Sequence, residues 1–194
     1  MQKNTIIIGL LLLVVGLGVG YTLGGDRTSI VGNHMMPDGS MMGQNIDQHF
    51  IVQMIPHHEG AIEMARVALE RSKRPEILSL ANGIIESQQK EIDDMRGWYQ
   101  SWYGSTPPAG GMGMMHMGSM EGDIDVLKTI SASDFDRAFM EQMIPHHEMA
   151  IMMVQMLAAG TERAEMKQLA ENIRTSQSRE IDMMRSWLAT WYAR

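Results

Sequence analysis

The sequence predicts an all-α protein, a four-helix bundle made of two duplicated helical hairpins and preceded by a single transmembrane helix. Three observations predict it. One helical unit occurs twice, its apolar residues recur at three- and four-residue spacing, and the first 25 residues hold one uncharged apolar run. Glycine and proline gather between the periodic segments, and the pattern offers no credible strand.

Residues 1–25 are expected to cross the membrane. The run 6–23 carries no charge and, as a helix, would rise about 27 Å, close to the thickness of a bilayer core. Lys3 before the run orients the N-terminus towards the cytoplasm. A cleaved secretory signal is the alternative, and we favour an anchor because no Ala-x-Ala-like triplet ends the run. The bundle is then anchored to the inner membrane and faces the periplasm, or is secreted there if the signal is cleaved.

Methionine is the most unusual feature of the composition. The chain of 194 residues has 22 methionines and no cysteine. Many methionines lie outside the periodic segments, in the tether 26–44 and in the glycine- and proline-rich linker 104–132. Thioether and imidazole suit Cu(I), whereas an exposed thioether gains nothing from burial; low-complexity drift is the alternative. The candidate ligands in the linker are Met112, Met114, Met115, His116 and Met117.

Charge and length narrow the class of protein. The formal net charge of −7 argues against a nucleic-acid partner and is compatible with attraction of cations. About 150 residues follow the anchor and tether, enough for one modest core, so residues 45–194 are expected to form one bundle domain.

The two hairpins, 45–103 and 133–194, carry the repeat. Residues 49–103 align with residues 138–192 without a gap, at a constant offset of 89 residues. In the first copy Pro75 follows a basic turn, as proline does at the first position of a helix. Pro56 and Pro145 interrupt periodic runs, so each must begin a helix or kink one.

A His-His pair follows each of these two prolines. Adjacent residues on a helix point about 100° apart, so His58 lies in the apolar stripe and His57 lies on its edge. The hairpin geometry brings Met54 and Met95 near this pair. We therefore predict two metal sites, with histidine ligation weakening below about pH 6; a core histidine bonded to Gln88 or to a carboxylate is the alternative. The predicted groups are Met54, His57, His58 and Met95, and Met143, His146, His147 and Met184.

The second copy adds a methionine ridge at helical spacing, formed by Met149, Met152, Met153 and Met156. We predict Met149 and Met152 as further ligands. An adaptable core surface is the alternative explanation of the ridge. The carboxylates Glu91 and Glu180 are expected among solvent-facing charges and salt bridges.

The doubled pattern FxxxMIPHHxxAIxM…LAxxIxxxQxxEIxxMxxW resembles the domain of unknown function 305 family over residues 49–103 and 138–192. The anchored, methionine-rich whole resembles a copper-resistance protein. This resemblance implies a ferritin-like bundle that binds copper outside the cytoplasm; the linker and the ridge are not part of the family motif. The residues that it carries over are Met54, His57, His58, Met64 and Met95, and Met143, His146, His147, Met153 and Met184.

The expected function is sequestration or relay of Cu(I), with Cu(II) or Ag(I) as further ligands, in copper homeostasis and resistance. A copper-transport or resistance protein would be the partner. We expect no enzyme, although a cuprous oxidase on the same bundle is the main alternative. A di-iron oxidase is disfavoured because the chain has no Glu-x-x-His motif. A purely structural bundle that assembles with a membrane partner is a third interpretation, and it predicts no metal.

Overall fold

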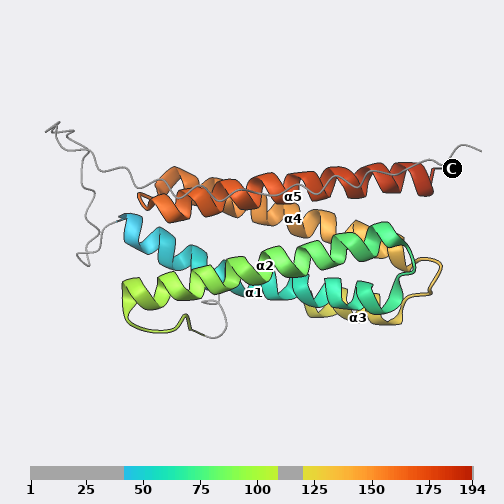
Figure 1. The fold of residues 1–194 in the computed structure, drawn as a ribbon, viewed down its shortest axis with the longest axis horizontal. Helices are drawn as coiled ribbons and strands as arrows, with labels where there is room; N and C mark the ends of the chain where they lie inside the picture. Colours follow the sequence, from blue (N-terminus) through green and yellow to red (C-terminus); the bar gives the residue numbers. More distant parts are fainter. Residues whose placement is uncertain (1–41, 109–119, 194) are drawn as a thin grey trace, which may run out of the picture. The chain divides into compact units, whose positions relative to one another are not determined.

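The computed structural model describes residues 42–108 and 120–193, which contain α-helices and, within these ranges, no strand. The helices are α1 (Met42–Arg71), α2 (Pro75–Tyr103), α3 (Met120–Thr129), α4 (Phe135–Gly160) and α5 (Ala164–Trp191). α1 packs with α2, α4 packs with α5, and α1 and α4 join the two hairpins (Figure 1). The predicted all-α class and the two hairpins are confirmed.

Both hairpin turns use the same hydrogen bond at equivalent positions of the repeat. The backbone N–H of Arg74 donates to Ser72 Oγ at 3.2 Å, and that of Arg163 donates to Thr161 Oγ1 at 3.2 Å. Short hydroxyl side chains bond to nearby backbone in this way and stop a helix. Gly104 then ends α2 in the left-handed conformation, with φ of 70°, which glycine adopts without steric cost.

Pro56 and Pro145 lie inside the continuous helices α1 and α4. Neither proline therefore begins a helix, which was one of the two alternatives. Each lacks the N–H that would bond to the carbonyl four residues earlier, so each leaves that carbonyl without its helical partner. The His-His pairs follow directly at this weakened point of the helix.

The helix α3 is not expected from the sequence, which predicts only a linker between the hairpins. Ile124 and Leu127 are buried, and α3 packs against α1 and α4. The Arg71 guanidinium fixes its end by donating to the carbonyls of Leu127 and Ile130, the latter at 2.6 Å. Only ten residues long, the helix offers too few apolar positions to stand out beside the glycine-rich stretch.

The core consists of two apolar clusters, one on each side of the middle of the bundle. Residues 50–55 of α1 pack with the C-terminal half of α4, and residues 61–68 pack with its N-terminal half, so α1 and α4 run antiparallel. Each cluster therefore draws on both hairpins. The first apolar cluster includes Phe50, Ile51, Met54, Ile92, Met95, Val154, Leu157 and Ile173. The second apolar cluster includes Met64, Leu80, Ile84, Leu127, Phe139, Met140, Met143 and Met184.

Two equivalent contacts, which we call the inter-hairpin latches, tie the hairpins together at their ends. In the first latch Arg163 lies 3.3 Å from the buried carboxylate of Asp47 and stacks over the Trp102 ring at 3.9 Å. In the second latch Arg74 lies 3.2 Å from the carboxylate of Asp136, and its guanidinium stacks over the Trp191 ring at 4.3 Å. Each arginine directly precedes the second helix of one hairpin and contacts both helices of the other hairpin.

Within residues 42–108 and 120–193, no helix is long and apolar enough to cross a membrane. The predicted anchor, residues 6–23, lies outside the described residues. The linker ligands Met112, Met114, Met115, His116 and Met117 lie outside them as well.

Candidate metal centre

Four histidines lie at the middle of the bundle, between the two apolar clusters. α1 supplies His57 and His58, and α4 supplies His146 and His147. The His57 and His146 rings meet across the α1–α4 contact, with their centroids 3.8 Å apart. Each lies 6.3 Å from the ring that follows it in the chain. We call these four side chains the histidine belt.

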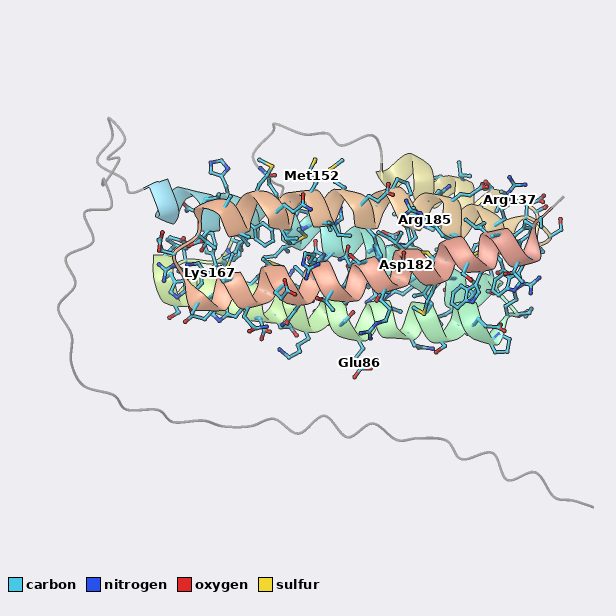
Figure 2. The ribbon with its side chains drawn as sticks, turned by 90° about the horizontal axis from the view of Figure 1, so that it is seen from above. Glu86, Arg137, Met152, Lys167, Asp182 and Arg185 are labelled. Carbon is cyan, nitrogen blue, oxygen red and sulfur yellow. The ribbon has the colours of Figure 1, made fainter. Side chains whose placement is uncertain are left out.

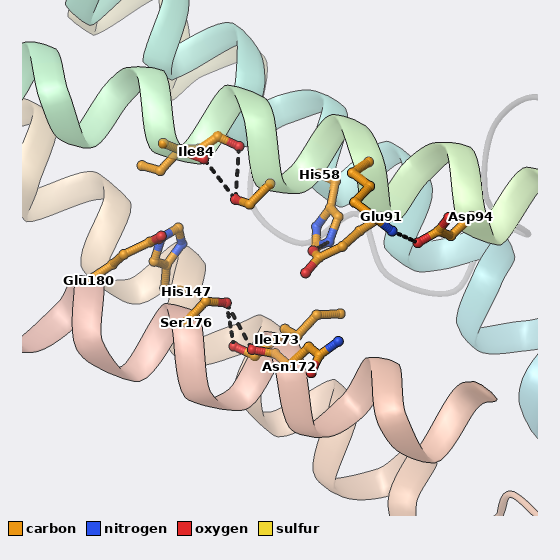
Figure 3. A network of polar contacts seen from close by, with 12 residues as sticks. His58, Ile84, Glu91, Asp94, His147, Asn172, Ile173, Ser176 and Glu180 are labelled. Atoms are coloured by element: carbon orange, nitrogen blue, oxygen red, sulfur yellow. Dashed lines mark hydrogen bonds and ion pairs between the residues drawn. The ribbon is translucent and has the colours of Figure 1, made fainter. Parts of the chain in front are cut away.

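A carboxylate bonds to each of the two outer rings of the belt, His58 and His147 (Figure 3). His58 Nε2 lies 2.7 Å from Glu91 Oε2, and His147 Nε2 lies 2.6 Å from Glu180 Oε2. An ionised carboxylate only accepts hydrogen bonds, so Nε2 carries the proton of the neutral ring and Nδ1 keeps its lone pair. Both Nδ1 atoms are buried and have no hydrogen-bond partner among the described residues. They are therefore available to a metal.

The stacked pair in the belt is held neutral. Burial, and then the charge that its neighbours would carry, lower the pKa of His57 well below its ordinary value. The same causes lower the pKa of His146 to about 3. For this pair, protons would therefore compete with a metal only at a pH well below the value of about 6 that the sequence suggests. His57 Nδ1 and both His146 ring nitrogens are also buried without a well-aligned hydrogen bond among the described residues, although each ring interacts with the backbone of the other histidine.

Leaving buried nitrogens without partners is costly, by about 1–3 kcal/mol for each group. Native proteins contain few such groups, and each calls for an explanation. Here the belt concentrates them on both sides of one helix contact. Binding of a cation is a direct explanation, because neutral imidazole is the metal-binding form of histidine.

Two methionines lie about one helical turn along the bundle from each carboxylate-bound histidine. Met54 lies one turn before His58 on α1, and Met95 lies one turn after Glu91 on the antiparallel α2. Both methionines are fully buried in the first apolar cluster. Met143 and Met184 occupy the equivalent places beside His147, in the second apolar cluster. The helices thus bring the members of each predicted group to the same part of the bundle, and their binding of a metal stays a prediction.

Met64 and Met153 lie apart from the groups of their own hairpins. Met64 belongs to the second apolar cluster, with Met143 and Met184, and Met153 packs against the first. The reason is the antiparallel crossing of α1 and α4 at the belt. Residues that follow the histidines in one hairpin meet the residues that precede the histidines in the other. Each methionine set is therefore shared between hairpins, which the repeat alone does not predict.

The ridge on α4 faces outward in part. Met156 is 64% exposed and Met152 is 43% exposed, and Figure 2 shows Met152 pointing away from the helices. Met152 and Met156 therefore lie at the surface, whereas Met149 and Met153 are partly buried.

Among the described residues, no group of three or more His, Asp or Glu side chains is placed to hold a metal ion. The helix register instead places donors of mixed type at each end of the belt: one imidazole nitrogen, and two methionines about one helical turn away. Soft donors of this kind suit Cu(I) and the similar ion Ag(I) better than a hard cation.

Sequence reasoning placed Glu91 and Glu180 among solvent-facing charges and salt bridges, and it left open a core histidine bonded to a carboxylate. In the structure each glutamate bonds to a buried ring within its own hairpin, and its side chain is only 13% exposed. A signal existed in the repeat. Each glutamate follows its histidine by 33 residues, and in an antiparallel hairpin two residues at this spacing lie opposite each other. The stacking of His57 on His146 had no such signal, because it joins different hairpins.

Comparison with known proteins agrees with this architecture. Structures of CopM match closely: the Cu(II)-bound form is 47% identical, with a TM-score of 0.69, covering 75% of this chain and 97% of CopM. The Cu(I)-bound form is 44% identical, with a TM-score of 0.67, covering 76% and 98%. A DUF305 fragment from Deinococcus radiodurans is 30% identical, with a TM-score of 0.67, covering 75% and 96%.

A shorter match is to an uncharacterized protein of Acanthamoeba polyphaga mimivirus, 47% identical over 49 residues. It covers 25% of this chain and only 32% of the viral protein. The profile of the family described as "Domain of unknown function (DUF305)" matches residues 47–193, which include both hairpins and the whole histidine belt. The chain therefore belongs to the DUF305 family.

Proposed function

We propose that this protein binds copper outside the cytoplasm, as Cu(I) above all, and protects the cell by sequestering the ion or relaying it. The observation that carries the proposal is the mixed donor set at each end of the belt. His58 and His147 each present a buried, unpartnered Nδ1 beside two buried methionines. The likeness to CopM, which has been solved with Cu(I), Cu(II) and silver bound, supports the choice of metal.

The donors fit Cu(I) for a second reason. Histidine binds metal through a neutral ring, and burial keeps the stacked pair neutral far below pH 7. Thioethers carry no proton to lose. Cu(II) and Ag(I) would bind the same donors, and the Cu(II) ion would rely more on the imidazoles.

The belt and the exposed methionines would form two classes of site. The belt donors are buried and held by Glu91 and Glu180, so they would bind the ion more firmly. Met152 on α4 is exposed and Met149 is partly buried, and both would capture ions weakly. The linker ligands Met112, Met114, Met115, His116 and Met117 would belong to the same capturing class.

The test is a titration of the full-length protein with Cu(I) against a competing chromophoric chelator. The parent protein should withdraw several equivalents. A variant with His57, His58, His146 and His147 changed to alanine should lose the tightest of them. His49→Ala is the matched control, because His49 is exposed and lies outside the belt. Circular dichroism would show that each variant remains helical, and failure of the folded parent to compete would refute the proposal.

We further propose stoichiometric binding without turnover. A cuprous oxidase would consume oxygen steadily while Cu(I) is supplied, whereas a binder would stop when its sites are full. An oxygen electrode distinguishes the two. Steady consumption that exceeds the number of sites would establish an enzyme instead.

The proposed location is the periplasmic side of the inner membrane, through residues 1–25, with a copper-transport or resistance protein as the recipient of the ion. This rests on the uncharged run 6–23. Fractionation of cells that produce the tagged protein tests it. Recovery from the membrane fraction, with the bundle accessible to protease from the periplasm, is the expected result.

A further inference from the structure

A groove of about 500 Å³ opens on the bundle between α2 and α5. Its lining combines two carboxylates, a thioether, the hydroxyl group of Ser79 and apolar side chains. Those used in the argument are Glu76, Leu80 and Gly83 from α2, and Glu180, Met183 and Trp187 from α5.

Glu180 connects this groove to the histidine belt. The same carboxylate that lines the groove accepts the 2.6 Å hydrogen bond from His147. The His147 ring itself is fully buried, while the Glu180 side chain is 13% exposed. Only one side chain therefore stands between the groove and a belt histidine.

Two consecutive methionines of α5 lead from the groove lining to the core. Met183 is partly buried and lines the groove, and the following residue, Met184, is fully buried in the second apolar cluster. The other hairpin lacks this pair. Its equivalent of Met183 is Asp94, which bonds to Lys90 at 2.5 Å, and the equivalent of Gly83 is the larger Asn172.

We propose that the groove between α2 and α5 is the route by which Cu(I) enters the belt, and that it loads the His147 end first. Glu76 and Glu180 attract the cation, the Met183 sulfur receives it, and His147 with Met184 takes it from there. Leu80 and Trp187 make the walls apolar, so the soft donors meet little competition from water. The inference rests on the proposed copper-binding function.

Gly83 offers a direct way to obstruct the groove. A Cβ atom added at Gly83 has nothing within 4 Å, and the same holds at Gly97, farther along α2 and outside the groove lining. Leucine fits at either position without a clash of its Cβ and contributes no donor atom. Both substitutions also replace an exposed helical glycine, so both should stabilise the helix equally. Gly83→Leu and Gly97→Leu are thus a matched pair.

The experiment follows transfer of Cu(I) from a chromophoric chelator to the full-length protein by stopped flow. Gly83→Leu should load about tenfold more slowly than Gly97→Leu, the change that about 1.4 kcal/mol of added entry barrier produces. The equilibrium affinity of the two variants should be the same, because the belt donors are unchanged. Met183→Leu, which keeps the volume and removes the sulfur, should also slow loading.

The outcomes separate the two proposals. If the parent protein binds Cu(I) and Gly83→Leu loads as fast as Gly97→Leu, the entry route is refuted and the function stands. If the parent protein does not compete for Cu(I) at all, the proposed function fails. Loss of affinity in Gly83→Leu with an unchanged loading rate would also overturn the route.

Discussion

At the scale of the residue, the decisive feature is which ring nitrogen carries the proton. Glu91 and Glu180 accept hydrogen bonds from the Nε2–H groups of His58 and His147, and this leaves each Nδ1 free for the proposed metal. A carboxylate that accepts a hydrogen bond from a metal-binding histidine orients the ring and raises its basicity. The roles of Glu91 and Glu180 can be tested without touching a ligand.

Glu180→Gln should lower the affinity for Cu(I) about 10- to 100-fold, the usual cost of losing such a partner. An amide can donate to Nε2 as well as accept from it, so the tautomer is no longer fixed. Chelator competition measures the change. Glu148→Gln is the control, since Glu148 is exposed and pairs with Arg185. Equal affinities in the two variants would contradict this role.

The stacked pair predicts that the metal-free protein is less stable in acid. The unfolded rings take up protons near pH 6.5, whereas His146 in the folded protein does so only at about 3 and His57 also well below its ordinary value. The stability they contribute is complete above pH 6.5 and is lost as the pH falls towards 3. By pH 5 the His146 ring should cost roughly 2 kcal/mol, and the His57 ring should add to this cost in the same direction.

Urea unfolding at pH 7, 6 and 5 measures this dependence. A variant with His57→Leu and His146→Leu is the comparison, because it lacks both titrating rings and keeps every carboxylate. Its unfolding free energy should fall less over the same pH range. Identical slopes would show that the pair is not held neutral.

At this scale the sequence predicted which residues of one hairpin lie near each other, but not the contacts between the hairpins. The spacing of Met54, His57 and His58 on one helix, and the antiparallel partner Met95, follow from helix geometry within a hairpin. The contact of His57 with His146 depends on how two hairpins cross. No local pattern contains that information.

At the scale of the element, the antiparallel contact of α1 with α4 determines which residues share a site. It places Met64 with the methionines of the other hairpin and Met153 with those of the first. The helix period and the turn residues predicted both hairpins. The period could not predict α3, whose burial depends on the surface that α1 and α4 present to it.

The inter-hairpin latches should stabilise this arrangement unequally. The Asp47 side chain is 2% exposed, against 15% for Asp136, so loss of Arg163 leaves a more buried charge than loss of Arg74. Arg163→Met should cost roughly 2–4 kcal/mol, at or below the range for a fully buried pair because Arg163 is itself 31% exposed. Arg74→Met should cost less.

Chemical denaturation of the two variants measures these costs. Arg96→Met is the control, since Arg96 and Glu59 are both about half exposed and such pairs contribute under about 1 kcal/mol. Adding Asp47→Asn to Arg163→Met should restore part of the lost stability, because it removes the isolated charge. Equal effects of the Arg74 and Arg163 changes would contradict the argument.

At the scale of the whole molecule, a polar belt divides two apolar clusters, and this costs stability. His57→Leu with His146→Leu should raise the unfolding free energy of the metal-free protein by about 1–3 kcal/mol, because buried nitrogens without partners are removed. Thermal unfolding without metal measures it. Added Cu(I) should raise the melting temperature of the parent more than that of the variant. A less stable metal-free variant would contradict the prediction.

The fold class was the easiest feature to predict. The repeat and its helical period were sufficient to predict two helical hairpins in one bundle. The order of the hairpins around the belt was not predictable. It depends on the packing of side chains such as Phe139 and Leu157 across the α1–α4 contact. The asymmetry between Met183 and Asp94 was visible in the sequence, but its meaning required the groove.

The meeting of His57 with His146 has a consequence for the ancestry of the chain. A single-hairpin protein could form the same contact only by self-association, with each copy giving one identical ring to a twofold axis. Gene duplication and fusion would remove that requirement for identity. The two halves could then diverge, so that one has Met149, Met152 and Met183 where the other has Gly60, Glu63 and Asp94. Present-day asymmetry would thus record a homodimer that became one chain.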